Sequence, residues 1–136
     1  MSNLNILLTG KYSDLVKCLL SIYELNVTKI NKGMYGCVYR NNHNIEIPNP
    51  KTEKSFAICL HEIGHKVLKH NKGKKRFIEE FEAWNYALNV FRILEIPIKN
   101  NVRNRYKKSI RYSISKAVRR GLNPKKIPSE IKRLIR

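Results

Sequence analysis

The sequence predicts an α+β protein that is mostly helical, with a small antiparallel sheet beside a central helix and a basic helical extension at the C-terminus. Apolar residues recur at helical spacing in three long segments before Pro97. Two short apolar segments flank an asparagine-rich turn, which is typical of an antiparallel hairpin. Beyond Pro97 the composition becomes strongly basic. We therefore divide the 136 residues, enough for one modest core, into a first region, 1–97, and a helical extension, 98–136.

The first elements are expected to be one helix and the hairpin. Between Tyr12 and Asn26 the apolar residues follow a helical period. Turn-forming residues occupy 29–36, and the segments Cys37–Arg40 and Asn44–Ile47 predict two strands around the asparagine-rich turn. Two prolines then end the second strand.

The rest of the chain is expected to be helical, with breaks at proline and glycine. Four helices are predicted: from 50–52 to about Asn71, with Gly73 as its stop; from Lys75 to Ile93, with Pro97 beyond its end; from Lys99 to Arg120; and from Ser129 to Arg136.

Composition excludes several classes of protein. The mean hydropathy is −0.47 and no apolar run approaches the roughly 18 residues of a transmembrane helix, so we expect no membrane association. The first ten residues lack the basic region and cleavage site of a signal peptide. The three cysteines form no pair at a metal or redox spacing. We therefore expect reduced thiols and a cytoplasmic protein.

The segment His61-Glu62-Ile63-Gly64-His65 carries the residues most suited to catalysis. On a helix, positions i and i+4 lie on one face, so His61 and His65 can direct ring nitrogens at one Zn²⁺ ion. Glu62 is turned about 100° from His61, close enough to act on a zinc-bound water without binding the metal. Zinc lowers the pKa of that water towards about 7, and Glu62 can take its proton and pass it to the leaving amine. Gly64 is expected to let a neighbour pack closely.

A catalytic zinc site needs a third protein ligand and leaves a fourth position for water. His70 lies five residues past His65, about 140° round the helix. We therefore expect His70 to point away from the ion and to be structural or exposed.

The segment 79–87 is a better source of the third ligand. Glu80 shares one helical face with Trp84 and with two alanines that permit close approach to the zinc helix. Glu80 is therefore the first choice and Glu79 the second, while Glu82 is expected to be exposed. The alternative is that these carboxylates only balance neighbouring lysines and an arginine.

These two segments carry a resemblance to a known family. Phe56 to His70 resembles the zinc helix of the ImmA/IrrE-type metallopeptidases, and Glu80 to Ala87 resembles their downstream Glu-x-Glu-Ala-x-x-aromatic-Ala helix, which supplies the third ligand. The match covers Lys32 to Leu94. It implies a gluzincin-like α+β fold, a single zinc and cleavage of peptide bonds in an intracellular protein substrate. Members of the family often occur in phages and mobile elements and cleave repressors, which implies the host cytoplasm or a virion as location.

Two features depart from the family pattern. Trp84 stands where related enzymes often carry Asp or Asn to orient a zinc histidine, so that histidine needs another partner. The Arg-rich tail is not part of the resemblance. A donor for the developing oxyanion is also needed, and the sequence does not choose among Tyr35, Tyr39, His43 and Tyr86. Substrates of this class commonly pair with an exposed strand before the zinc helix, for which 44–47 is the candidate.

The net charge of +18 is concentrated in the extension. Seven of the ten arginines lie between Lys99 and Arg136, with seven lysines and one acid, Glu130. Such segregation favours a polyanionic partner, so DNA or RNA is a candidate. The alternatives are a solvated cationic helix or one that packs on an acidic protein. The residues expected to contact phosphates are Arg103, Arg105, Lys107, Lys108, Arg111, Arg119 and Arg120.

The sequence therefore predicts a zinc metallopeptidase of the HExxH class. The alternative function is a nucleic-acid-binding or virion-associated structural protein that retains a zinc-binding fold without turnover. A third possibility is a protease for DNA-bound proteins, like the SprT-like enzymes, but those use a third histidine as ligand.

Overall fold

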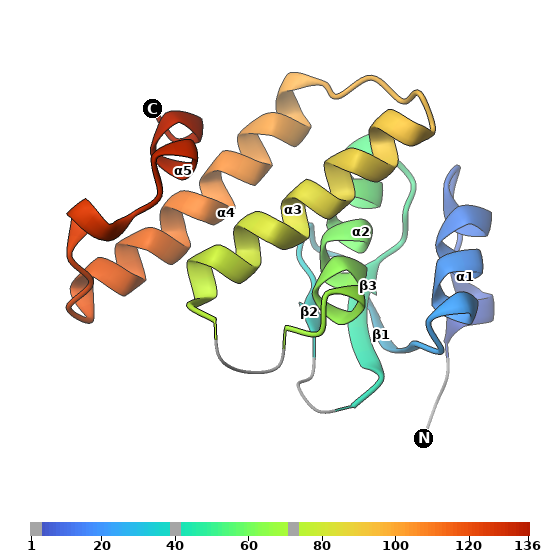
Figure 1. Cartoon of the computed structure of the whole chain (residues 1–136). Coiled ribbons are helices and arrows are strands. Elements are labelled where there is room, and N and C mark those ends of the chain that lie inside the picture. The colour runs from blue at the N-terminus through green and yellow to red at the C-terminus, as the bar shows by residue number, and fades with distance from the viewer. Residues whose placement is uncertain (1–3, 39–41, 71–73) are drawn as a thin grey trace.

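The protein is a mostly helical α+β fold, as the sequence predicts. The computed structural model describes residues 4–38, 42–70 and 74–136 (Figure 1). Several predicted features lie outside these described residues: Tyr39 and Arg40 at the end of the first predicted strand, Asn41 in the turn, and Asn71 and Gly73 at the predicted end of the helix. In chain order the elements are η1 (Asn5–Leu7), α1 (Ser13–Ile22), β1 (Asn26–Asn31), β2 (Cys37–Val38), β3 (Asn44–Pro48), α2 (Glu53–Val67), α3 (Arg76–Ile93), α4 (Asn100–Arg119), η2 (Pro124–Lys126) and α5 (Ser129–Leu134).

The sheet is mixed, with the strand order β1-β3-β2. β2 and β3 form the antiparallel pair that the sequence predicts, with Cys37 opposite Glu46. β1 pairs parallel with β3, so the prediction of an antiparallel sheet is wrong for the larger part of the pairing. β1 escapes sequence analysis because only Val27 and Ile30 are apolar in it. Its parallel partner also lies beyond a long connection that local patterns do not reveal.

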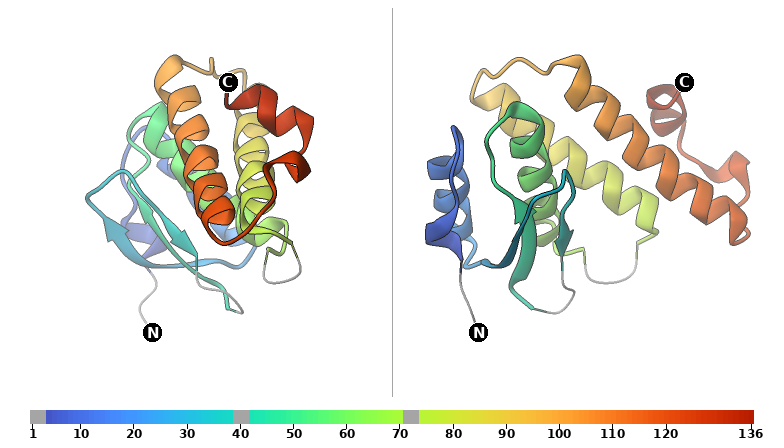
Figure 2. Two further views of the ribbon diagram at one scale, coloured as in Figure 1. Left: turned by 90° about the vertical axis from the view of Figure 1, so that its left-hand side faces the viewer. Right: turned by 180° about the vertical axis from the view of Figure 1, so that it is seen from behind.

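α2 is the central helix of the fold. It packs against β3, α1 and α3, and α4 packs along α3 and also touches α2 (Figures 1 and 2). Tyr12, at the start of α1, stacks on Phe56 of α2, with ring centroids 4.5 Å apart. Phe56 in turn stacks on Phe91 of α3 at 5.4 Å. α2 is therefore held on several sides, which fixes the direction of its side chains.

Both ends of α2 are defined by local hydrogen bonds. Thr52 caps the start: its Oγ1 accepts from the Ser55 N–H, and Ser55 Oγ accepts from the Thr52 N–H. The helix ends at Val67, four residues before the predicted end. Lys69 adopts a left-handed conformation with φ 57°, and the His70 N–H then donates to the His65 carbonyl. This early end turns the chain back towards the helix face that carries His65.

One hydrophobic core continues into the basic extension. Val102 and Ile110 of α4 and Ile131 of α5 are completely buried in the same cluster as the side chains of α2 and α3. The predicted boundary between residues 97 and 98 lies between α3 and α4, and the core is continuous across it. Over the described residues, no helix combines the length and hydropathy needed to cross a lipid bilayer.

Candidate metal centre

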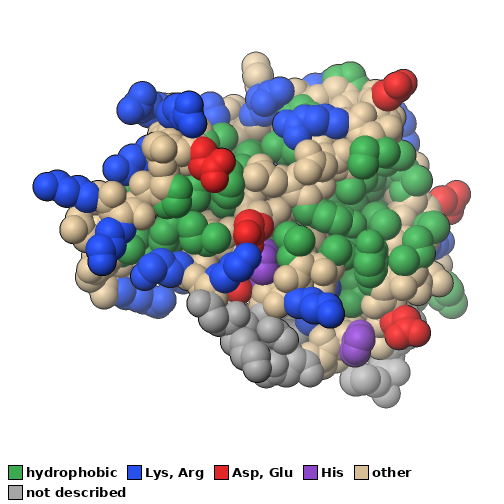
Figure 3. Space-filling model, viewed as in Figure 1, with side chains coloured by type: hydrophobic (Ala, Val, Ile, Leu, Met, Phe, Trp, Pro, Cys, Tyr) green, Lys and Arg blue, Asp and Glu red, His purple; other side chains and the backbone are tan. Residues whose placement is uncertain are grey.

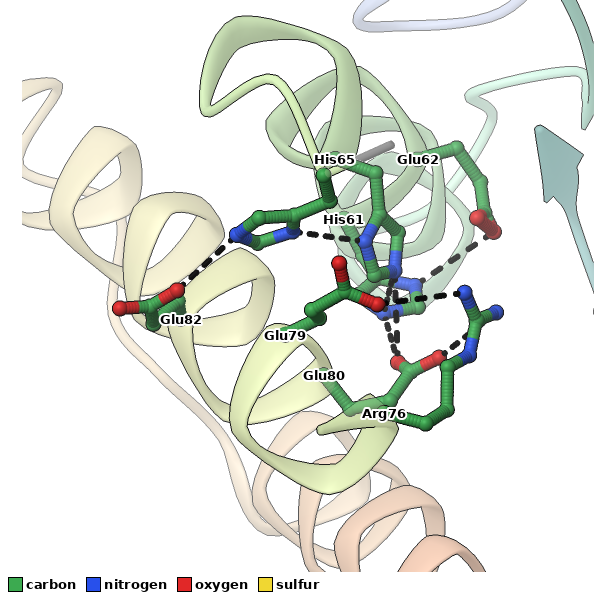
Figure 4. Close-up of polar contacts among 8 residues, drawn as sticks. His61, Glu62, His65, Arg76, Glu79, Glu80 and Glu82 are labelled. Atoms are coloured by element: carbon green, nitrogen blue, oxygen red, sulfur yellow. Dashed lines mark hydrogen bonds and ion pairs between the residues drawn. The ribbon is translucent and has the colours of Figure 1, made fainter. Parts of the chain in front are cut away.

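The motif histidines lie on the buried face of α2 that meets α3. His61, Glu62 and His65 are 6%, 5% and 2% exposed, so this is not a pair of surface histidines beside a solvated glutamate. The one-turn spacing directs both rings to the same side of α2 (Figure 4). Glu80, from the first half of α3, faces them from the opposite helix and is also buried.

These three side chains bring two nitrogens and one oxygen together. His61 Nε2 lies 2.5 Å from Glu80 Oε2, and His65 Nε2 lies 3.2 Å from His61 Nε2 and 3.5 Å from Glu80 Oε2. Ligands at about 2.0–2.1 Å from a tetrahedral zinc ion are about 3.4 Å apart, so two of the three separations already suit a shared ion. The third separation, between His61 Nε2 and Glu80 Oε2, is that of a direct hydrogen bond, and a small rotation of the carboxylate would lengthen it.

The chemistry of the donor set also fits zinc. All three donor atoms lie within 4.8 Å of one another, and in the described part of the chain this is the one such group of at least three His, Cys, Asp or Glu residues. Two imidazoles and one carboxylate are the ligands of a catalytic rather than a structural zinc site, because structural sites use four protein donors.

Within the cluster, the histidines and the carboxylates each favour the charged form of the other. Burial disfavours the charged form of His61, but the Glu62 and Glu80 carboxylates outweigh burial and raise its pKa to about 9. Burial also disfavours the charged form of Glu80, yet hydrogen bonds with His61 and His65 hold the pKa of Glu80 well below its usual range. The Glu80 carboxylate is therefore ionised and available as a ligand at neutral pH.

The structure distinguishes Glu80 from Glu79. Glu80 Oε2 contacts both motif histidines, and its other oxygen pairs with Arg76 at 3.2 Å. Glu79 is 1% exposed and lies 3.9 Å from the Arg76 guanidinium. The assignment of Glu80 as a ligand stays a prediction, but the geometry favours it over Glu79.

Close helix packing permits this arrangement. A Cβ atom on Gly64 would lie 3.1 Å from the Ala83 carbonyl oxygen and 3.3 Å from the Ala83 Cα, so Gly64 and Ala83 allow α2 and α3 to approach, as the sequence suggests. Trp84, one turn beyond Glu80, stacks on the His61 ring with centroids 4.6 Å apart. Tyr106 of α4 also stacks on Trp84, with centroids 5.6 Å apart, and donates a hydrogen bond to Asn85.

Glu62 lies beside the three donors without belonging to them. Its Oε2 is 3.5 Å from His61 Nδ1 (Figure 4). The side chain also lies against Gly36, just before β2, where a Cβ atom would be 2.4 Å from Glu62 Cγ. Gly36 therefore leaves room for the Glu62 side chain beside the end strand of the sheet.

His70 is not one of the three donors, and of the two roles expected for it, structural or exposed, the structure shows the first. It is buried, with its Nδ1 3.0 Å from His65 Nδ1 and its Nε2 3.0 Å from Glu82 Oε1, and sequence analysis did not predict these contacts. Glu82 is half-buried rather than exposed, and also accepts from Lys74. The 140° argument fails because α2 ends at Val67, so the helical period no longer places His70. The segment that resembles the family's zinc helix ends at His70, and this was the available signal for such a partner.

The proposed strand for substrate pairing is also corrected. β3, residues 44–48, is the middle strand and is paired on both sides, so it offers no free edge. The oxyanion candidates gain no assignment. Burial raises the pKa of Tyr86 to about 12, Tyr35 and His43 are exposed, and Tyr39 lies outside the described residues.

The basic residues of α4 do not form a single row. Arg111 donates to the Ile135 carbonyl at 2.8 and 3.1 Å and so holds α5, and the Arg105 guanidinium lies 5.9 Å from the Trp84 ring. The half-buried Lys107 lies with Arg103 in a depression lined by α3, α4 and α5. Lys108, Arg119 and Arg120 are exposed.

Comparison of this chain with protein-family models, with curated proteins and with solved structures finds no match in any of the three.

Proposed function

We propose that this protein is a zinc-dependent endopeptidase that hydrolyses peptide bonds of a protein substrate. One observation carries the proposal: two imidazole Nε2 atoms and a carboxylate oxygen meet in a buried site, with a further carboxylate, Glu62, beside them. The resemblance of the two helices to ImmA/IrrE-type metallopeptidases supports the same function. The site's burial supports catalysis, because electrostatic interactions strengthen where water is excluded.

His61, His65 and Glu80 would hold the ion. A zinc ion bound there would polarise the scissile carbonyl and lower the pKa of a water molecule. Arg76 keeps one Glu80 oxygen oriented, and Trp84 keeps the His61 ring in place by stacking. With His65 Nε2 as a ligand, the proton of His65 lies on Nδ1, which donates to His70 Nδ1, and His70 Nε2–H donates to Glu82.

Glu62 is the residue that moves protons. Its carboxylate takes a proton from the water whose oxygen attacks the carbonyl carbon, and it delivers that proton to the amine as the carbon–nitrogen bond breaks. The Glu62 side chain lies against Gly36, which precedes the end strand β2. We therefore expect the substrate backbone to pair with β2, in place of β3.

The test is the substitution Glu62→Gln. We expect about one zinc per chain by elemental analysis in both the natural sequence and the variant, because Glu62 is not a donor. We expect new protein termini, identified by mass spectrometry in expressing cells, only with the natural sequence. The loss in rate should be at least about a hundredfold, as for removal of a general base.

Glu95→Gln is the matched control. Glu95 is exposed two residues beyond the end of α3, which is about 20 Å along the helix from Glu80. It should leave zinc content and cleavage unchanged. The proposal fails if saturating zinc does not bind, or if the same termini accumulate in cells expressing Glu62→Gln.

A second candidate function is supported by the exposed cations Lys108, Arg119, Lys125 and Lys126. They suit nucleic-acid binding by a structural protein without turnover. Binding of a labelled oligonucleotide whose logarithmic affinity falls steeply with the logarithm of salt concentration, together with no cleavage, would favour this function.

A further inference from the structure

A pocket of about 500 Å³ lies next to the candidate metal centre, between the start of α3 and the C-terminal half of α4. Phe77 and Leu122 give it apolar walls, and Ser109 and Ser113 give it hydroxyl groups. Glu80 lines the same pocket, so the pocket and the metal centre share a wall. In Figure 3, hydrophobic side chains lie between Lys and Arg side chains over these ends of α3 and α4.

The pocket carries an excess of positive charge. Lys75, Arg76, Lys116 and Arg120 line it, and Glu80 is its one acidic lining residue. Arg76 pairs with Glu80. In the described part of the chain, the other three cations form no ion pair with an acidic side chain, and the Lys116 ammonium lies 5.1 Å from the Tyr112 ring. Their charge is therefore available to a ligand.

We propose that this pocket binds an acidic side chain of the substrate, close to the bond that is cleaved. The inference rests on the proposed peptidase function, and it names the class of substrate. An aspartate or glutamate side chain has a carboxylate for Lys116 and Arg120 and a short apolar stem for the walls of Phe77 and Leu122. Because the pocket and the metal centre share Glu80, a side chain bound there places its own backbone beside the site of hydrolysis.

The shape of the pocket favours a peptide over nucleic acid. A nucleic-acid backbone presents a continuous row of phosphates, which extended basic surfaces contact. Here the cations surround a concave, partly apolar space, as in sites that enclose one small group.

Binding can be measured without turnover. The probes are two peptides with blocked ends, Ala-Ala-Glu-Ala-Ala and Ala-Ala-Gln-Ala-Ala, added to the full chain carrying Glu62→Gln, with zinc present. We expect the glutamate peptide to shift the backbone amide resonances of Ser113 and Gly121 and to bind about tenfold more tightly than the glutamine peptide. Equal binding of the two peptides overturns the inference.

A pair of double variants locates the binding. Lys116→Gln with Arg120→Gln removes two charges from the pocket, and we expect affinity for the glutamate peptide to fall about tenfold. Lys108→Gln with Arg119→Gln removes the same charge from the exposed surface of α4, outside the pocket. This control should change affinity less than about twofold, because neither side chain lines the pocket and salt screens charges that lie further from the ligand. An equal loss in both would mean that the general positive field, not the pocket, attracts the peptide.

The outcomes separate this inference from the peptidase itself. A single-stranded oligonucleotide that shifts the pocket amides when the glutamate peptide does not would overturn the inference in favour of nucleic acid. If the glutamate peptide binds as expected and the natural sequence cleaves nothing, the peptidase fails and the pocket assignment stands. If cleavage occurs with no preference for acidic residues near the cleaved bond, the peptidase function stands and the pocket assignment fails.

Discussion

At the scale of single residues, the clearest feature is the chain of contacts behind His65. Its Nδ1 meets His70 Nδ1 at 3.0 Å, and His70 continues through its other ring nitrogen to Glu82. Partners of this kind hold a metal-binding histidine in one orientation and one tautomer, and their loss weakens metal binding although they do not touch the ion.

We therefore predict that His70→Ala lowers zinc affinity about 10- to 100-fold. The fold should persist, because the side chain lies at the end of α2 and not in the apolar cluster. Competition with a coloured chelator measures the zinc dissociation constant. His43→Ala, at an exposed histidine, is the control. An unchanged affinity in His70→Ala would show that His65 needs no support from this side.

A second prediction concerns pH. Burial opposes the charged form of His61, but Glu62 and Glu80 raise its pKa in the metal-free chain to about 9, so at neutral pH the ring carries a proton that zinc must displace. Zinc affinity should therefore rise from pH 6 to pH 8, beyond the rise due to an ordinary histidine of pKa 6.5. Isothermal titration in two buffers of different protonation enthalpy measures the protons released. Release of none at pH 7 would contradict the prediction.

Most of the residues of the candidate site could be predicted from residue patterns. The helical period alone put His61 and His65 on one face of α2 and chose Glu80 from three neighbouring carboxylates, and the structure brings these three together. The pattern did not find His70, because its position depends on where α2 ends. The helix ends through a left-handed residue, but that residue is Lys69 and not the glycine or asparagine that usually indicates a helix end in a sequence.

At the scale of elements, the site depends on the spacing of α2 and α3, since each helix supplies part of the donor set. Gly64 keeps that spacing small: a Cβ atom there would meet the backbone of Ala83, which cannot yield without movement of α3. The gap between the helices is therefore part of the site.

We predict that Gly64→Ala lowers the free energy of unfolding by about 1 kcal/mol. Crowding costs about 1–3 kcal/mol, and the better helix propensity of alanine returns about 1 kcal/mol of it. Zinc affinity should fall as well, since α3 carries Glu80. Urea denaturation with and without a chelator measures both effects. Ser115→Ala, on the exposed side of α4, is the control and should be neutral or stabilising. Gly64→Ala would contradict the prediction by behaving like the control.

The elements were predictable in proportion to their regularity. The long helices and the β2–β3 pair follow from periodicity, and Thr52 marks the start of α2 through its capping box. β1 does not follow from periodicity, because polar residues interrupt its alternation of apolar residues. Its pairing with β3 is fixed by contacts of the whole fold.

At the scale of the whole molecule, the basic extension is also a structural layer. Tyr106 stacks on Trp84, and Val102 and Ile110 are completely buried. The change of composition at Pro97 reflects the exposed residues of this segment and not its buried ones, so composition alone does not reveal that the extension shares the core.

We predict that a fragment of residues 1–97 lacks a fixed tertiary structure. Its α3 would expose the apolar surface that α4 covers, including that of Trp84. A two-dimensional NMR spectrum should show poorly dispersed signals, and zinc affinity should fall sharply, because Trp84 supports His61. A fragment with a dispersed spectrum and full zinc affinity would mean that the first 97 residues fold alone.

The meeting of α2 and α3 at His65 and Glu80 has one more consequence. These residues are fifteen positions apart, and an ion held by both would join the two helices as a cross-link does, closing the loop between them. An ion that binds the folded chain alone also stabilises it in proportion to its free concentration. The concentration of free zinc would then set both the catalytic activity and the stability of the folded chain. A shortage of zinc would therefore lower the activity and also hasten unfolding.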